Sequence, residues 1–249
     1  MSVYEALAAS YDGLTYDIPY DDVLRFMQQL LNKAGVKPET VVDLACGTGS
    51  LSVRLAKAGY RVYGVDLSED MLTVAMNKAM ELEENMPFFI CQNMCELELP
   101  EQVDWVVCML DSINYLADPN DCAAMIRQVA ACLKPGGMFI FDFNTPYKLR
   151  GLDGQVFLDE NEDSYCVWRA EFDEEENICY YGIDLFQYVE EEDLWERSFE
   201  EHREYAYTPE QLTAYLQQAG FESITLYGDG ELRAPTQTEQ RIYITAIKR

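Results

Sequence analysis

The chain has 249 residues, with 45 Asp or Glu against 18 Lys or Arg, which gives a formal net charge of −27. About half of the residues are hydrophobic and 12% are aromatic, so a sizeable core can form and intrinsic disorder is not expected. Direct binding to nucleic acid or to an anionic membrane surface is also not expected. Phosphate groups are held by clustered Lys and Arg, and the sequence shows no such cluster.

Targeting and metal-binding signals are missing from the sequence as well. No apolar run reaches 18 residues, and the first residues lack the basic and apolar segments of a signal peptide. We therefore expect no membrane association and a cytoplasmic protein with reduced thiols. The eight cysteines contain no C-x-x-C pair and the chain has one histidine, so no metal site is expected.

Strand and helix patterns alternate through the first 145 residues. Apolar runs typical of buried parallel strands occupy 41–45, 61–66, 88–91, 103–108 and 138–143. Helical patterns with one apolar face lie at about 50–58, 69–83 and 120–133, and a further helix is expected to begin near Tyr20. Repeated β-α units of this kind predict a parallel sheet with helices on both faces.

The pattern changes after residue 145. Between about 146 and 204 we find no convincing amphipathic helix, whereas strand-like stretches occupy 165–172, 178–189 and 195–207. We interpret 146–204 as an inserted antiparallel β-rich lid, or substrate subdomain. Residues 159–204 contain 18 acids and three Arg. This charge makes either a solvated outer face or a negative lid over a pocket for a neutral or cationic ligand.

The last segment returns to α/β patterns. Thr208 is a suitable cap for a helix that begins at Pro209 and runs to about Gln218. Strand patterns at 222–227 and 241–247 have no helix between them, so they should form an antiparallel hairpin. The fold expected is a doubly wound, Rossmann-like α/β fold with a mostly parallel seven-stranded sheet. Its main domain comprises 1–145 and 205–249, interrupted by the β lid.

The main functional motif follows the first strand. It reads Asp-Leu-Ala-Cys-Gly-Thr-Gly-Ser over residues 43–50, and its glycines let the backbone take positive φ and pass close to a ligand. Asp66 ends the next strand, where an acid can accept hydrogen bonds from both ribose hydroxyls. Glycine loop, acid and strand-turn-helix context together predict a nucleoside site at the C-terminal edge of the sheet.

The kind of nucleoside is narrowed by what the loop lacks. A dinucleotide site needs a third glycine where Ser52 stands, and no Walker lysine follows the loop. The carboxylate of Asp43 would repel a pyrophosphate but suits an ammonium group. A nucleoside ligand without phosphates is therefore favoured over NAD.

Four segments carry a family resemblance, namely Val41–Gly49, Gly64–Leu72, Asp111–Leu116 and Leu133–Asp142. Together with the reversed terminal hairpin, they resemble class I S-adenosylmethionine-dependent methyltransferases. The resemblance is greatest to a bacterial small-molecule-type branch with an N-terminal Tyr-Asp segment and a β-rich lid. It covers about 1–145 and 205–249, whereas the lid matches only in type.

The resemblance implies S-adenosyl-L-methionine as the cofactor and a set of residues that bind it. This set is Tyr11, Tyr20, Asp43, Ala45, Cys46, Gly47, Gly49, Asp66, Leu67, Met71, Asn93, Met94, Leu110 and Asp111. In such enzymes Asp43 would face the amino group, Asp66 the ribose, and Tyr11 and Tyr20 would close over the cofactor. Ala45 stands where many relatives have glycine, and Asn93 where the family commonly has an Asp that binds adenine.

The catalytic residues are not identified by the sequence. Asp111, Tyr115 and His202 are weak candidates for a base, which methyl transfer needs if the acceptor atom carries a proton. We expect in-line transfer to an O or N atom of a small-molecule acceptor. Two alternatives stay open. The protein could be a protein or RNA methyltransferase that works with a partner, or a non-catalytic module that binds the cofactor. The sequence also leaves the oligomeric state open, as monomer or dimer.

Overall fold

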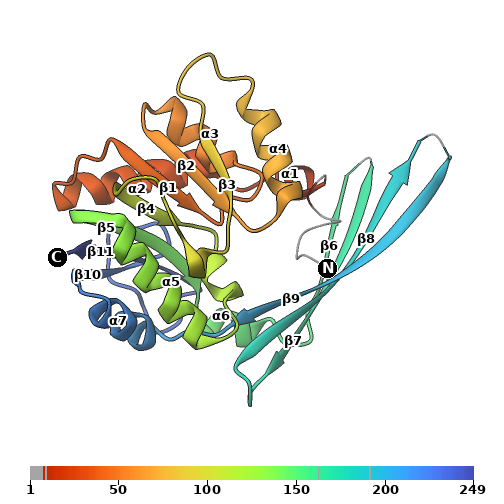
Figure 1. Cartoon of the computed structure of the whole chain (residues 1–249). Helices are drawn as coiled ribbons and strands as arrows, with labels where there is room; N and C mark the ends of the chain where they lie inside the picture. The colour runs from red at the N-terminus through yellow and green to blue at the C-terminus, as the bar shows by residue number, and fades with distance from the viewer. Residues whose placement is uncertain (1–7, 9, 162, 191) are drawn as a thin grey trace.

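The computed structural model describes residues 8, 10–161, 163–190 and 192–249, which contain two β-sheets (Figure 1). The large sheet has the strand order β10-β11-β5-β4-β1-β2-β3. Its first five strands along the chain run parallel, whereas β11 is antiparallel to both β5 and β10. The strands are β1 Thr40–Leu44, β2 Arg61–Asp66, β3 Phe88–Cys91, β4 Val103–Cys108, β5 Leu133–Asn144, β10 Phe221–Gly228 and β11 Arg241–Lys248. The expected mostly parallel seven-stranded sheet with a reversed terminal hairpin is confirmed.

Helices cover both faces of the large sheet. α5 and α7 pack with one hydrophobic cluster, and α2 and α3 with another. Val106 and Val107 belong to different clusters, because successive side chains of a strand point to opposite faces. The main helices are α2 Tyr20–Ala34, α3 Ser50–Lys57, α4 Glu69–Ala79, α5 Pro119–Cys132 and α7 Pro209–Gln218. Nowhere in the described part of the chain is a helix long and apolar enough to cross a membrane.

Capping side chains fix where two of these helices begin. Ser68 Oγ accepts a hydrogen bond from the Met71 N–H at 3.2 Å at the start of α4. Thr208 and Gln211 form a reciprocal capping box at the start of α7, with Pro209 in its first turn. Both starts agree with the sequence prediction, whereas α4 ends at Ala79, four residues earlier than expected.

The small sheet has the order β6-β7-β8-β9 and is antiparallel throughout. Its strands are β6 Val156–Glu160, β7 Ser164–Asp173, β8 Ile178–Val189 and β9 Leu194–Tyr205. The expected antiparallel β insert is therefore present. β6 was not predicted, because this edge strand is exposed along its whole length and shows no alternation of apolar and polar residues.

No convincing amphipathic helix was expected in 146–204, but the structure has one short helix there. α6 comprises Pro146–Gly151, with Pro146 in its first turn and the Thr145 hydroxyl accepting a hydrogen bond from the Lys148 N–H. Six residues are too few to show a helical apolar period, so the sequence pattern could not reveal it.

Apolar contacts with α1 and α6, and a buried amide, attach the small sheet to the rest of the chain. Leu14 of α1 (Tyr11–Leu14) and Leu149 of α6 pack into one cluster with residues of β7 and β8. Asn114 lies in the short helix η2 (Ser112–Tyr115), and its Nδ2 donates to the carbonyls of Asn144 and Tyr205 at 3.0 and 2.9 Å. These bonds join the end of β5 to the end of β9, where β9 runs back to the large sheet (Figure 1).

Candidate functional site

The loop after β1 has the backbone conformation that a close ligand approach requires. Ala45, Gly47 and Gly49 all have positive φ, at 58°, 54° and 71°. A Cβ at Gly49 would lie 2.8 Å from the Cβ of Ala75, whereas a Cβ at Gly47 would meet no atom within 4 Å. Gly49 thus permits close packing of the loop on α4, and Gly47 faces open space. Ala45 is in the left-handed region that favours glycine, the residue expected there in relatives.

Asp66 lies at the carboxyl end of β2, beside this loop. Its two carboxylate oxygens accept hydrogen bonds from the N–H groups of Gly47 at 2.7 Å and Ser68 at 2.9 Å. Burial raises its pKa above the usual range, and the backbone hydrogen bonds oppose that shift. Each oxygen keeps a lone pair for a further donor such as a ribose hydroxyl.

Asp43 is buried beneath the loop. It accepts a 2.6 Å hydrogen bond from the hydroxyl of Ser52, the residue in the third-glycine position. Burial raises the pKa of Asp43 to about 7, the bond from Ser52 lowers it, and the nearby Asp66 adds to the increase. A buried carboxyl group with this pKa is ready to accept a cationic group, which would hold it in the ionised form.

The N-terminal helix α1 is tied to the loop by Asp12. One oxygen of Asp12 accepts from the hydroxyls of Thr48 and Ser50, at 2.7 and 3.3 Å, and the other pairs with Lys78 Nζ at 2.7 Å. These polar contacts join the N-terminal segment, the loop and α4. This pairing has no signal in the sequence, because Asp12 and Lys78 are far apart in the chain.

Tyr11 and Tyr20 lie among the acids of this region. Burial raises both pKa values, that of Tyr20 to about 12, and Asp66 and Asp111 add to the increase at Tyr11. Asp43 adds to the increase at Tyr20. Two tyrosines of the N-terminal segment are therefore within electrostatic range of the predicted cofactor residues, while their hydroxyl groups stay neutral at pH 7.

The remaining predicted residues of the nucleoside half differ in their exposure. Leu67, directly after Asp66, is exposed, whereas Met71 is buried in α4. Asn93 caps a short helix, η1 (Met94–Glu96), and its Oδ1 already accepts from the Cys95 N–H at 2.9 Å. If this oxygen also bound adenine, it would accept two hydrogen bonds, one from adenine and one from the Cys95 N–H. Cys46, in the loop, donates its N–H to the Val65 carbonyl and so ties the loop to β2.

The loop after β4 contains Leu110 and Asp111, both with positive φ. The carboxylate of Asp142, fully buried at the end of β5, accepts from both of their N–H groups, and Arg241 binds both Asp142 and Asp111. Of the three weak base candidates, Asp111 is therefore paired with an arginine. Arg241 and Asp142 were not named from the sequence, since 130 residues separate Arg241 from Asp111.

The other two base candidates are brought together. His202, on β9, is almost fully buried, and its Nε2 lies 2.9 Å from Glu200 Oε2. Its Nδ1 lies 3.5 Å from the hydroxyl of Tyr115, which belongs to η2. A side chain of the small sheet thus meets one from the large-sheet part, and we call Tyr115, His202 and Glu200 the histidine cluster.

Glu204 is a further buried acid near the site, and it was not predicted from the sequence. It lies two residues after His202 on β9 and accepts a 2.8 Å hydrogen bond from Asn144 Nδ2. Burial raises its pKa to about 8, and the charge of Asp111 adds to that increase. Glu200, His202 and Glu204 are spaced by two residues, so their side chains lie on one face of β9. This spacing is the sequence signal from which Glu204 could have been predicted.

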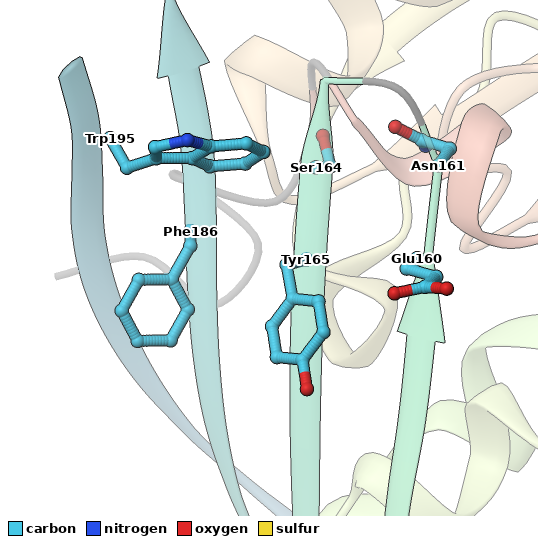
Figure 2. Close-up of a pocket in the computed structure, with 6 residues that line it drawn as sticks. All are labelled: Glu160, Asn161, Ser164, Tyr165, Phe186 and Trp195. Atoms are coloured by element: carbon cyan, nitrogen blue, oxygen red, sulfur yellow. The ribbon is translucent and has the colours of Figure 1, made fainter.

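A separate cavity of about 480 Å³ lies on the small sheet. Figure 2 shows the aromatic side chains of Tyr165, Phe186 and Trp195 along it, with Glu160 beside them. None of the predicted cofactor or base residues lines this cavity. It is therefore distinct from the candidate site, which lies at the carboxyl ends of β1, β2 and β4 and the facing strand β9.

Comparisons with known proteins agree on one family. A family described as "Methyltransferase domain" matches residues 41–137. A candidate methyltransferase of Geobacillus sp. (strain WCH70) is 33% identical, over 98% of this chain and 99% of its own. A solved S-adenosylmethionine-dependent methyltransferase from Clostridium acetobutylicum ATCC 824 is 29% identical with a TM-score of 0.85, covering 98% of both chains.

A second solved structure shows the same fold at lower identity. CalS10, an amino pentose methyltransferase from Micromonospora echinaspora with S-adenosylmethionine bound, is 19% identical, with a TM-score of 0.75. The similarity covers 100% of this chain and 99% of that one. The small sheet is thus included in the shared fold.

Proposed function

We propose that this chain, which belongs to the S-adenosylmethionine-dependent methyltransferases, methylates a nitrogen or oxygen atom of a small-molecule acceptor. The acceptor would lie between the loops at the carboxyl ends of the large sheet and the face of the small sheet that carries His202. The observation that carries this proposal is the histidine cluster, in which the two parts of the chain contribute side chains to one proton-handling group.

The cofactor side of the proposal rests on the loop after β1. S-adenosylmethionine supplies the methyl group, as a sulfonium substituent. Asp66 would hold the ribose, with lone pairs left after its bonds to Gly47 and Ser68. Asp43 would face the cationic amino group, directly or through a water molecule. The open space above Gly47 gives the methionine part room to lie against the backbone.

The acceptor side rests on the chemistry of the histidine cluster. A nitrogen or oxygen nucleophile that carries a proton must lose it on methylation, and histidine is the usual base near neutral pH. With the Nε2 proton donated to Glu200, the Nδ1 of His202 accepts from the Tyr115 hydroxyl. Tyr115 would contact the acceptor. Its oxygen would take the acceptor's proton while its own hydroxyl proton moves to Nδ1 of His202. Positioning of acceptor and cofactor supplies the rest, and is worth roughly 7–11 kcal/mol in such reactions.

The charge of the molecule favours a small acceptor over RNA. A net charge of −27 repels a polyanion, whereas the buried acids of the small sheet tolerate a neutral or cationic ligand. The amino pentose substrate in the name of CalS10 points to the same class of acceptor.

The test is transfer of label from S-adenosylmethionine with a radioactive methyl group. The purified chain is offered a panel of small amines, phenols and hydroxy compounds, and in parallel bulk RNA and cell protein. Label is expected in small molecules. Transfer to RNA or protein alone, with none to the panel, would contradict the proposal.

Variants of the histidine cluster then test its role with the acceptor so found. His202→Gln and Tyr115→Phe are expected to lower kcat about 100-fold, the usual contribution of a positioned base, with the cofactor Kd unchanged. Tyr180→Phe, on the opposite face of the small sheet, is the matched control and should retain full activity. Unchanged kcat in both cluster variants would remove the cluster from the mechanism.

A further inference from the structure

Two consecutive residues after β4 have an unfavourable backbone conformation. Leu110 and Asp111 have φ of 59° and 54°, in the left-handed region, and neither is glycine. In this region the Cβ of a non-glycine residue lies too close to the backbone carbonyl, which costs conformational energy. Such a pair persists only where the surrounding structure holds it.

The group that holds the pair is the carboxylate of Asp142. It accepts the Leu110 N–H at 2.6 Å and the Asp111 N–H at 3.1 Å, one on each oxygen. Asp142 is fully buried at the end of β5, so its charge needs a partner. Both N–H groups point at one carboxylate only while the backbone keeps its left-handed turn.

Arg241 supplies the partner charge and a second connection. At the start of β11, its guanidinium donates to Asp142 with one nitrogen and to Asp111 Oδ1 with another, the latter at 2.5 Å. The planar fork of arginine suits this two-point contact, which a lysine cannot reproduce in the same geometry. We call Asp142, Arg241 and the Leu110–Asp111 pair the β4-loop clamp.

The clamp lies where the two sides of the site meet. β4 pairs with β1 in parallel, so its carboxyl end is next to the loop of Gly47. The charge of Asp111 raises the pKa of Tyr11 on the cofactor side and of Glu204 on the small sheet. Asp111 is therefore within electrostatic range of both.

We propose that Arg241 is a positioning residue, which with Asp142 holds the Leu110–Asp111 turn in shape against the methionine part of the cofactor. The inference rests on the proposed cofactor site. It also assigns the Asp111 carboxylate to the clamp and not to proton removal, since that carboxylate is bound to a permanent cation. The general base of the reaction is then sought in the histidine cluster.

The test compares two ligands by calorimetric titration: S-adenosylmethionine, which reaches the clamp, and adenosine, which occupies only the nucleoside half. Arg241→Lys keeps the charge but loses the fork, and Arg241→Gln loses both. S-adenosylmethionine affinity is expected to fall about 10-fold in the Lys variant and further in the Gln variant, while adenosine affinity stays within about twofold. If the Gln variant does not fold, the Lys variant carries the test.

Two further variants separate positioning from general stability. Arg197→Lys changes an arginine bound to the buried Asp184 in the small sheet and should leave both affinities unchanged. Asp111→Gly combined with Arg241→Lys should regain part of the lost affinity, because glycine at this one of the two left-handed positions adopts the turn without the clamp.

Two results would overturn the inference. One is equal affinity of the Arg241 variants and the parent chain for S-adenosylmethionine, and the other is an equal loss for both ligands. Asp66→Ala, titrated in parallel, separates this failure from failure of the cofactor site. If Asp66→Ala leaves both affinities intact, the site itself is misassigned. If it weakens both while Arg241→Lys weakens neither, only the clamp is wrong.

Discussion

Single buried acids set the electrostatics of the candidate site. Asp43, Asp66, Asp142 and Glu204 all have pKa values raised by burial, within a chain that already carries a net charge of −27. Asp142 is paired with Arg241, whereas Asp43 accepts hydrogen bonds from the hydroxyl and backbone of Ser52, and burial raises its pKa to about 7. Above about pH 7 the free protein therefore holds a buried, unfavourable charge at Asp43, which a cationic ligand would offset.

This charge predicts a pH dependence of stability that Asp43→Asn should remove. The folded pKa of Asp43, about 7, exceeds the usual value of 3.8 for an aspartate, so the folded state binds more protons between those pH values. Its contribution to the free energy of unfolding therefore falls as pH rises from about 4 to 7. Urea titrations at pH 5 and pH 7.5 should show the variant gaining stability relative to the parent chain as pH rises.

The exposed Asp22 provides the control, since Asp22→Asn should show no such trend. A stability difference between Asp43→Asn and the parent chain that is constant with pH, or that moves in the parent's favour, would contradict the burial of this charge.

Some residues of the candidate site could be predicted from a short stretch of sequence, whereas others could not. Asp43, Gly49 and Asp66 could be named from the sequence because a strand end, a turn and a helix start lie within a few residues. Arg241, Asp142 and Glu204 could not, because their partners are brought in by the folding of distant strands. The roles assigned to Asp43, Gly49, Asp66, Asp142 and Arg241 at the cofactor site stay predictions.

The elements of the fold divide in a similar way. Long apolar strands and capped helices such as α7 were predictable, since each carries a complete local signal. β6 and α6 were not, because one is an exposed edge strand and the other has six residues. The conformation of the loop between β1 and α3 depends on its glycines. Gly49 packs closely against Ala75 of α4, whereas Gly47 faces open space.

A pair of substitutions in this loop should separate packing from ligand space. In Gly49→Ala the new Cβ would clash with Ala75 at 2.8 Å in addition to the strain of a positive φ, so we expect a loss of about 2–4 kcal/mol in unfolding free energy. In Gly47→Ala only the strain applies, and a loss of about 1–2 kcal/mol is expected.

Gly47→Ala should nevertheless bind S-adenosylmethionine at least 10-fold more weakly, because its Cβ occupies the space left for the cofactor. Denaturant titration and calorimetry measure the two effects. Equal destabilisation in both variants, or unaltered binding by Gly47→Ala, would refute the placement of these glycines.

At the scale of the whole molecule, the excess negative charge opposes the compact state. Residues 159–204 carry 18 acids and three Arg, and much of the small sheet is exposed. Arg169 and Arg197 are bound to one acid, Asp184, and so neutralise little of this charge. The net repulsion is long-ranged and is therefore reduced by dissolved salt.

The melting temperature should rise with salt for this reason. Between about 0.02 and 0.3 M NaCl the Debye length falls from about 20 to 6 Å, which screens repulsion between surface acids. An increase of several degrees is expected by scanning calorimetry. A melting temperature that is flat or falls over this range would show that the local ion pairs outweigh the net charge.

We propose that the loop after β1 and the acid at the end of β2 form one S-adenosylmethionine site. Calorimetric titration of the parent chain and of Asp66→Ala with S-adenosylmethionine, with NAD as the control ligand, tests it most directly. We predict micromolar binding of S-adenosylmethionine by the parent chain, at least 10-fold weaker binding by Asp66→Ala, and no binding of NAD. Unchanged affinity in Asp66→Ala, or binding of NAD in place of S-adenosylmethionine, would show that these residues do not form an S-adenosylmethionine site.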